Sequence, residues 1–300
     1  MPEAVIRTQA LVKDYGRTRA LHGVDLEVAR GELFGFIGPN GAGKSTTIRV
    51  LLDLIRPTSG SAEVLGVRQL SAHPELRARV GYLPGELSLD GAQTAREHLG
   101  YLASLRGGRG LDRIAPLAER FRLDLDRPFR GLSKGNKQKV GVVQAFMHEP
   151  ELLILDEPTS GLDPLLQKEF LTLVREAHAA GATALISSHI LSEVEAIADR
   201  VAIMRAGRVV DVEGVAALRA RAGQHLRLRF DSPPPPDLFG GCTELSEVQV
   251  EGNELTAVLH GSPDAALKRA ARLTVIGLWV QDRNLEELFM DHYREPGARP

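Results

Sequence analysis

The chain has 300 residues, of which 43% are hydrophobic, and a formal net charge of −2 from 37 basic and 39 acidic side chains. This nearly neutral net charge gives no reason to expect binding to nucleic acid or to an acidic membrane surface. Any partner must therefore be sought in local motifs. The length predicts about two domains on a prior of ~150 residues each. The single cysteine, Cys242, excludes an intrachain disulfide and suits a reducing compartment.

The N-terminal stretch MPEAVIRTQALVKDYG lacks the apolar run of a signal peptide, which predicts that the protein stays inside the cell. The longest stretch without Asp, Glu, Lys or Arg runs from Ala177 to Ser192 and has sixteen residues, including two histidines. A membrane-spanning helix needs about 20 mostly apolar residues. The sequence therefore predicts a cytoplasmic chain without a transmembrane segment.

Roughly the first two hundred residues alternate short apolar runs with longer amphipathic stretches, which is typical of α/β domains with helices on a largely parallel sheet. The early segment GVDLEV alternates strictly, with Val24, Leu26 and Val28 apolar, and predicts an antiparallel edge sheet with one solvated face. Later apolar runs with little alternation predict strands that are buried on both faces. These runs are Leu33 to Gly38, Leu152 to Asp156, Ala182 to Ser188 and Arg200 to Met204.

Strand signals disappear between about residues 86 and 139. The stretches TAREHLGYLASL and IAPLAERFRL have helical periodicity there, so we expect a helical subdomain inserted in the α/β domain. The α/β domain is expected to cover residues 1–214.

A change of character after Gly214 predicts a second domain over residues 215–300. The proline run from Asp231 to Pro236 is too stiff for a helix or a central strand. The sequence further predicts a hairpin that turns at Gly252-Asn253, a helix over 264–273, a strand over 274–280 and a final helix over 284–293. The expectation is a small accessory α+β domain.

The stretch GPNGAGKST matches G-x-x-x-x-G-K-[ST] between an apolar strand and a helix predicted over 45–55. In such a P-loop the backbone N–H groups wrap phosphates, the lysine reaches the β- and γ-phosphates, and the following hydroxyl binds Mg²⁺. A glycine-rich turn without a ligand is the alternative interpretation. The predicted nucleotide-binding residues are Gly38, Pro39, Asn40, Gly41, Ala42, Gly43, Lys44, Ser45 and Thr46.

A second acidic motif, LLILDEP, ends a predicted buried strand. Asp156 is placed to hold Mg²⁺, and Glu157 is placed to orient or deprotonate a water that attacks the γ-phosphate. Alone, this pair could be two solvated acids at a turn before Pro158; together with a P-loop, the catalytic interpretation is favoured. Lys44, Glu157 and His189 are the predicted catalytic residues, while Ser45 and Asp156 are the predicted metal ligands.

Both motifs would also suit a kinase or a GTPase, but three more motifs follow in a specific order: LSKGNKQKV, then SGLD after LLILDEP, then SSH. In this order they resemble the ATP-binding cassette (ABC) transporter ATPases, and the resemblance covers about residues 4–212. It implies ATP and Mg²⁺ as ligands, and two cassettes that pack head to tail with two ATP molecules between them. A separate integral membrane permease would complete the transporter.

The resemblance also implies roles for individual residues. Ser133 and Gly135 of the signature loop would bind the ATP of the facing cassette, and Asp163 would link the two sites. His189 would contact the γ-phosphate, although a histidine after an apolar strand is more often structural. Tyr15 resembles the family's aromatic platform for adenine, the alternative being a surface or core tyrosine.

The signature stretch places Lys134, Lys137 and Lys139 at the start of a predicted helix, where the helix dipole disfavours cations. Under the family resemblance, the anion that offsets them would belong to another chain. The sequence departs from the family at Lys134, where glycine is usual, and at Asn136, where glutamine is usual. Gly85 stands where the family normally has a glutamine that contacts Mg²⁺ and the attacking water.

The leading hypothesis is a cytoplasmic ATPase subunit, peripheral on the inner face of the membrane, that energises a separate permease. Parts of the sequence more weakly resemble the exporter branch that handles drugs, antibiotics and other amphiphiles. A soluble ABC ATPase that acts on ribosomes or DNA is the second hypothesis, although the balanced charge predicts no nucleic-acid partner. A P-loop kinase is the third, but no acceptor pocket is evident in the sequence.

Overall fold

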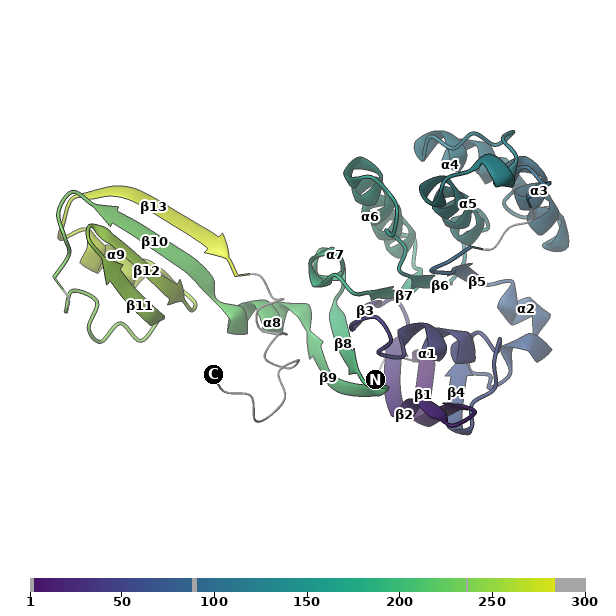
Figure 1. Ribbon diagram of the computed structural model, residues 1–300, viewed down its shortest axis with the longest axis horizontal. Coiled ribbons are helices and arrows are strands. Elements are labelled where there is room, and N and C mark those ends of the chain that lie inside the picture. Colours follow the sequence, from purple (N-terminus) through teal and green to yellow (C-terminus); the bar gives the residue numbers. More distant parts are fainter. Residues whose placement is uncertain (1–2, 88–90, 236, 284–300) are drawn as a thin grey trace. The chain divides into compact units, whose positions relative to one another are not determined.

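The computed structural model describes residues 3–87, 91–235 and 237–283 (Figure 1). The chain divides into two compact units, residues 1–212 and 213–300. The helix predicted over 284–293 lies outside the described residues.

A six-stranded sheet lies at the centre of the first unit, in the order β5-β6-β7-β3-β8-β9. The strands from β5 to β8 in this order pair in parallel. Every residue of β3, β6 and β7 is buried, which confirms the prediction of strands covered on both faces. The bounds are β3 (Leu33–Ile37), β5 (Val80–Leu83), β6 (Leu152–Asp156), β7 (Thr183–Ser188), β8 (Arg200–Arg205) and β9 (Arg208–Gly214).

A separate antiparallel sheet has the order β2-β1-β4 and is formed by β1 (Ala4–Tyr15), β2 (Thr18–Ala29) and β4 (Ser59–Val64). The alternating residues Val24, Leu26 and Val28 of β2 are all buried. The alternation in the sequence therefore identified the buried face of this sheet correctly.

The described residues between β5 and β6 contain helices but no strand. Figure 1 shows α3, α4 and α5 together above the main sheet, with α1 and the antiparallel sheet below it. Within the described residues no helix has the length and apolar character needed to cross a bilayer. The helices are α1 (Lys44–Leu51), α2 (Pro74–Arg77), α3 (Ala95–Leu105), α4 (Ile114–Arg120), α5 (Lys134–Phe146), α6 (Pro164–Ala179) and α7 (Leu191–Glu195), with 3₁₀ turns at Leu70–Ala72, Leu111–Arg113 and Phe129–Gly131.

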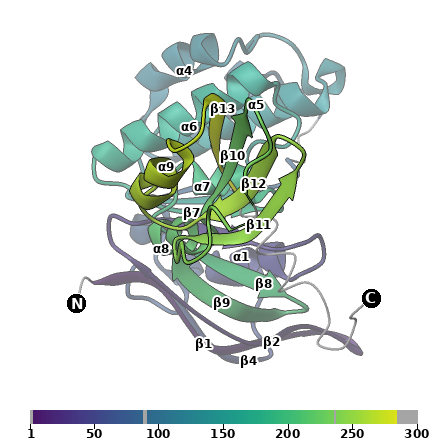
Figure 2. The same ribbon diagram turned by 90° about the vertical axis from the view of Figure 1, so that its left-hand side faces the viewer.

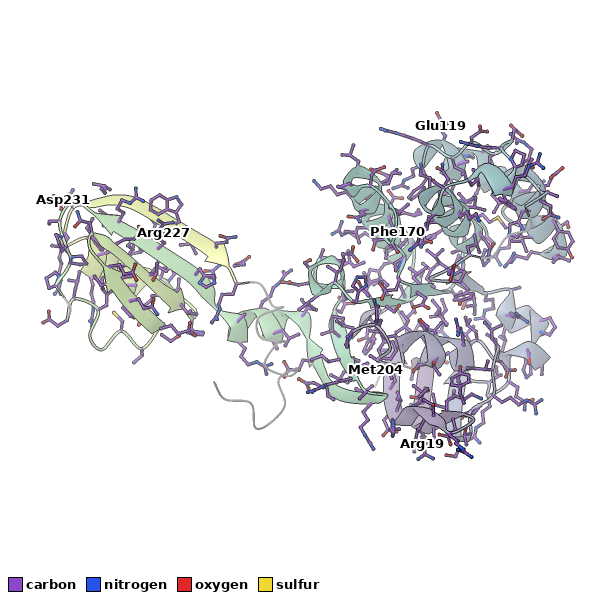
Figure 3. The ribbon with its side chains drawn as sticks, in the orientation of Figure 1. Arg19, Glu119, Phe170, Met204, Arg227 and Asp231 are labelled. Atoms are coloured by element: carbon purple, nitrogen blue, oxygen red, sulfur yellow. The ribbon has the colours of Figure 1, made fainter. Side chains whose placement is uncertain are left out.

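Two apolar clusters use alternate residues of the main sheet. Leu153 and Leu155 of β6 belong to the cluster that contains Phe170 of α6, whereas Ile154 belongs to the cluster that contains Met204 of β8. Figure 3 labels Phe170 and Met204, one from each cluster. Because the sheet is buried on both faces, the ends of its strands have fixed positions. The P-loop follows β3 and Glu157 follows β6 at such ends.

The helix after the P-loop is shorter than predicted, because α1 ends at Leu51 and not near Ile55. Asp53 adopts the left-handed conformation with φ of 55°, which a continuing α-helix does not allow. The Asp53 carboxylate accepts a hydrogen bond from the Ser71 backbone N–H at 3.3 Å. The helix therefore ends before this left-handed residue, although the periodicity alone would continue it.

The second unit is an antiparallel sheet in the order β11-β12-β10-β13 with a helix beside it (Figure 2). Ala266 and Ala270 of α9 are buried together with Leu226 and Leu228 of β10. β11 and β12 turn at Gly252-Asn253, as expected. The elements are α8 (Val215–Ala222), β10 (Gln224–Phe230), β11 (Leu245–Glu251), β12 (Glu254–Leu259), α9 (Asp264–Ala270) and β13 (Val275–Asp282).

Candidate nucleotide-binding and catalytic site

The P-loop connects the end of β3 to α1. Gly41 has φ of 80° and Gly43 has φ of 110°, in the region that glycine adopts without a steric penalty. A Cβ on Gly38 would lie 2.3 Å from the Met204 carbonyl oxygen, and one on Gly43 would lie 2.7 Å from Met204 Cε. Glycine is therefore required at both positions, because β8 passes directly behind the loop.

Lys44 begins α1 and is only 5% exposed. Its Nζ donates to the Gly38 carbonyl at 2.5 Å and to the Pro39 carbonyl at 3.3 Å. Nζ also lies 3.2 Å from Glu157 Oε1, an ion pair without hydrogen-bond geometry, since this oxygen has no hydrogen-bond partner. A buried ammonium group needs such compensation, so the surrounding oxygens hold the lysine charge inside the loop.

The end of β6 carries the two acidic residues predicted from LLILDEP. Asp156 is buried, and its Oδ1 accepts a hydrogen bond from Ser187 Oγ at 2.5 Å. Glu157 has φ of 48°, and its backbone N–H donates to the same Ser187 Oγ at 3.1 Å. A left-handed non-glycine residue costs on the order of 1–3 kcal/mol, so the neighbouring β7 stabilises a conformation that the chain would otherwise avoid.

His189 directly follows β7. Its Nδ1 lies 2.6 Å from Glu157 Oε2, while the Lys44 ammonium faces the other carboxylate oxygen. The Glu157 carboxylate is therefore positioned from both sides, by one residue of the P-loop helix and by one residue after β7. The three predicted catalytic residues meet at this carboxylate.

A cavity of about 510 Å³ brings together five residues from three of the predicted motifs, the P-loop, LLILDEP and SSH: Asn40, Ser45, Asp156, Glu157 and His189. Both predicted metal ligands line it. Thr46 follows in the first turn of α1 and is half-buried, and Ala42 is buried with its N–H donating to the Pro39 carbonyl at 3.1 Å. The remaining cavity residues are Arg49, Tyr82, Pro84, Gly85, Glu86, Lys134 and Ser160.

Tyr82 is another residue that lines this cavity. Burial, together with the negative charge of Asp156, raises the pKa of Tyr82 above its ordinary value. The phenol is therefore less acidic than an ordinary tyrosine, and its protonated hydroxyl can donate a hydrogen bond. Sequence analysis did not identify Tyr82.

The signature loop begins α5. Ser133 is the N-cap, and its Oγ accepts from the Asn136 N–H at 3.3 Å. A Cβ on Gly135 would lie 2.3 Å from the Gly161 carbonyl oxygen, so this position must be glycine where the SGLD segment passes. Neither Ser133 nor Gly135 is among the residues that line the 510 Å³ cavity.

The sequence analysis did not predict a role for Gln138 of α5. It is 2% exposed, and its Nε2 donates to the Pro158 carbonyl at 3.0 Å. The side chain therefore ties the signature helix to the loop that follows Glu157. A glutamine in a lysine-rich helix gave no signal of this contact.

Asp163 has a local structural role at the start of α6. Its Oδ1 accepts from the N–H groups of Leu165 and Leu166 at 3.1 and 3.0 Å, and Pro164 occupies the first helical position. This cap accounts for the SGLDP pattern within one chain. The predicted link between two sites remains a prediction.

Tyr15 lies at the end of β1, outside the residues that line the cavity. Its side chain is 45% exposed, and Lys13 Nζ lies 5.3 Å from the ring centroid. The ring is accessible to a ligand, and its role as an adenine platform remains a prediction.

The three signature lysines have different surroundings. Lys134 lines the 510 Å³ cavity of its own chain, and it lines a second cavity of about 240 Å³ together with Lys137 and Glu86. Lys139 Nζ instead lies 3.5 Å from the Arg122 carbonyl oxygen. Sequence analysis expected the offsetting anion in another chain, and it did not anticipate that Lys134 faces the catalytic cavity of its own chain.

Comparison with known proteins agrees with this geometry. The sequence pattern of the family described as ABC transporter matches residues 21–160. The daunorubicin/doxorubicin resistance ATP-binding protein DrrA of Streptomyces peucetius is 38% identical, over 76% of this chain and 71% of DrrA. The Nod factor export ATP-binding protein I of Paraburkholderia xenovorans is 33% identical, over 97% of both chains.

Solved structures lead to the same family. An ATP-binding subunit of an ABC transporter has a TM-score of 0.66 to this chain and is 37% identical, over 72% of this chain and 92% of that one. The resemblance inferred from the order of the motifs is thereby confirmed. The chain belongs to the ABC transporter family, as an ATP-binding subunit that hydrolyses ATP.

Proposed function

We propose that this chain works as one of two facing cassettes and that its ATP hydrolysis drives export through a separate membrane permease. The observation that carries the proposal is the meeting of Lys44, Glu157 and His189 at one carboxylate beside Ser45 and Asp156. The similar proteins of Streptomyces and Paraburkholderia are named for drug resistance and for export. They support a drug, an antibiotic or another amphiphile as the exported compound.

The binding step follows from the P-loop. Its backbone N–H groups and the Lys44 ammonium would bind the phosphates of ATP, with Asn40 of the loop lining the same cavity. The γ-phosphate would compete with Glu157 for Lys44, because the ammonium lies 3.2 Å from that carboxylate.

The hydrolysis step follows from the Glu157 carboxylate. With Lys44 engaged by phosphate, Glu157 Oε1 is available to orient and deprotonate a water molecule. His189 keeps its contact to Oε2 and fixes the direction of the carboxylate. The His189 ring is 46% exposed, so it can also reach a phosphate, as the family resemblance implies.

The residues present fit a magnesium ion. The Ser45 hydroxyl and the Asp156 carboxylate are hard oxygen donors, and both line the cavity. Among the described residues no group of three or more His, Cys, Asp and Glu side chains could hold a metal alone, so phosphate oxygens would complete the coordination. When bound, Mg²⁺ would neutralise phosphate charge during hydrolysis.

The second cassette is proposed from the signature loop. Ser133 is exposed at the N-terminus of a thirteen-residue helix, where backbone N–H groups and the helix dipole favour an anion. Ser133 and Gly135 would bind the ATP of the facing cassette, while Asp163 would couple the two sites. Tyr15 would stack on adenine. The permease would hold the pair at the cytoplasmic face of the membrane.

Mixing two inactive variants tests the proposal. Lys44→Ala protein mixed with Ser133→Ala protein should regain part of the ATPase activity, because a mixed dimer contains one composite site with both residues intact. A mixture of Lys44→Ala with the Lys44→Ala/Ser133→Ala double variant is the control, since it contains no intact site. If the first mixture stays as inactive as the control, the two residues do not act between chains.

A further inference from the structure

One carboxylate outside the cavity ties together the two loops that carry Glu157 and His189. Glu193 Oε2 accepts a hydrogen bond from Thr159 Oγ1 at 2.8 Å and another from Ser188 Oγ at 3.0 Å. Thr159 lies two residues after Glu157, and Ser188 directly precedes His189. A single oxygen atom therefore connects the chain after β6 with the chain after β7.

Both hydroxyls are buried, since Thr159 is 6% and Ser188 is 1% exposed. Buried hydroxyl groups need hydrogen-bond partners, and bonds to an ionised carboxylate are about twice as strong as neutral ones. Ser188 Oγ also accepts from the Ile190 N–H at 2.9 Å, so this hydroxyl connects the residue before His189 with the residue after it. The conformation of the chain at His189 therefore depends on the Ser188 hydroxyl, which Glu193 orients.

The element that carries Glu193 is itself firmly packed. Leu191 and Val194 of α7 are buried. A Cβ on Gly35 of β3 would lie 2.2 Å from Val194 Cγ1, so α7 approaches the central sheet as closely as only a glycine allows. Glu193 therefore extends from a support that is fixed relative to β3, the strand that leads into the P-loop.

Glu193 is not among the residues that line the 510 Å³ cavity, so it does not contact the reacting groups. The two loops that it joins carry the contact between Glu157 Oε2 and His189 Nδ1 at 2.6 Å. Ser187 makes a separate connection on the Asp156 side, where its Oγ donates to Asp156 Oδ1 and accepts from the Glu157 N–H. The ends of β6 and β7 are thus joined by two independent side-chain connections.

We infer that Glu193 is a positioning residue for ATP hydrolysis, which sets the geometry of Glu157 against His189 through Thr159 and Ser188. This inference rests on the proposed roles of Glu157 and His189. Small displacements of reacting groups can cost about 100-fold in rate, so the effect belongs in kcat. The P-loop residues that bind ATP come from a different segment, so KM for ATP should stay within about twofold.

The test compares Glu193→Ala with Glu193→Gln. The alanine variant should lower kcat by about 10- to 100-fold at unchanged KM, because both hydroxyls lose their acceptor. The glutamine variant keeps an oxygen at the same place, so it should recover most of the activity. Glu119→Gln, on the exposed surface of α4, is the matched control and should behave as wild type.

A double-mutant comparison shows whether the carboxylate acts through the two hydroxyls. Thr159→Val and Ser188→Ala nearly conserve volume, so they remain informative if Glu193→Ala is poorly folded. Either change should lower kcat, and the Thr159→Val/Glu193→Ala pair should lose less than the product of the two single losses. Fully multiplicative losses, or a rise in KM with unchanged kcat, would overturn the inference.

The Glu157→Gln background separates this inference from the proposed function. If Glu193 acts through Glu157, Glu193→Ala should have little further effect once Glu157 is a glutamine. If Glu157→Gln alone leaves turnover unchanged, the proposed role of Glu157 is wrong, whatever Glu193 does. If Glu157→Gln is slow while Glu193→Ala equals the Glu119→Gln control, the inference about Glu193 alone fails.

Discussion

The buried Lys44 forms an ion pair with Glu157, a residue that lines the catalytic cavity, with 3.2 Å between Nζ and Oε1. The lysine belongs to the P-loop helix and the glutamate to the end of β6, so the pair joins the phosphate-binding segment to the proposed general base. Because Lys44 is buried, its charge must always have an anionic or carbonyl partner. Under the proposed mechanism, nucleotide binding would exchange the Glu157 carboxylate for a phosphate as the partner of the lysine, and would so release the base.

Lys44→Ala should lower the rate of ATP hydrolysis by about 10² to 10³, because it removes a preorganised charge from the phosphate cradle. It also leaves Glu157 Oε1 without its cation. Phosphate release by the purified protein measures the effect. Lys168→Ala, on an exposed face of α6, is the control for loss of a lysine. A Lys44→Ala rate within twofold of this control would contradict the assignment.

Glu157→Gln should bind ATP but hydrolyse it very slowly, since a carboxamide cannot accept the proton of the attacking water. With hydrolysis blocked, dimers with bound ATP should accumulate, and size-exclusion chromatography with ATP and Mg²⁺ would detect them. The same variant without nucleotide provides the monomer reference. Turnover at the wild-type rate would remove Glu157 from its catalytic role.

Gly85→Gln should lower the Mg²⁺ concentration needed for half-maximal activity by a few-fold, because a carboxamide oxygen would be added beside Asp156. A Cβ at this position would lie 3.4 Å from the Asp156 carbonyl oxygen and 3.5 Å from Oδ2, which is ordinary contact. The glutamine can therefore be accommodated. Gly85→Ala adds the Cβ without the carboxamide oxygen and is the control. Unchanged Mg²⁺ dependence and turnover would show that this position is not limiting.

His148 should make the protein less stable as the pH falls from about 6.5 to about 4. Burial, with the charge of Arg106 nearby, lowers the pKa of His148 from 6.5 to about 4. Its Nε2 lies 3.2 Å from the Val80 carbonyl, and its buried Nδ1 has no hydrogen-bond partner. The folded protein therefore favours the neutral ring, and the unfolded chain binds the proton more readily between these two pH values.

The loss of stability should approach about 3 kcal/mol near pH 4, because one pKa unit corresponds to 1.36 kcal/mol. Urea unfolding between pH 7 and pH 5 measures the part of this stability loss that occurs above pH 5. In this range the carboxylates with lowered pKa, such as Glu151, stay ionised. His148→Gln keeps a donor for the Val80 carbonyl and should flatten this pH dependence. An equal slope in the variant and in the wild type would show that another group is responsible.

The sequence by itself determined the most deeply buried strands, the order of the motifs and the family. Leu152–Asp156 is apolar throughout because both faces of β6 are buried, and the Gly38 to Thr46 motif is recognisable because its chemistry needs consecutive residues. An apolar run and a short motif are both properties of neighbouring residues, so residue spacing and periodicity are enough to recognise them. The end of α1 was one exception, since the left-handed conformation of Asp53 lies where the periodicity would extend the helix.

Only the tertiary structure decided which side chains meet. The order of the strands brings the ends of β6 and β7 side by side, and the contacts of Glu193 with Thr159 and Ser188 follow from that order. In the same way, the close approach of Gly135 to Gly161 joins two motifs that lie apart in the chain. These contacts depend on packing across the sheet, which residue spacing along one segment does not encode.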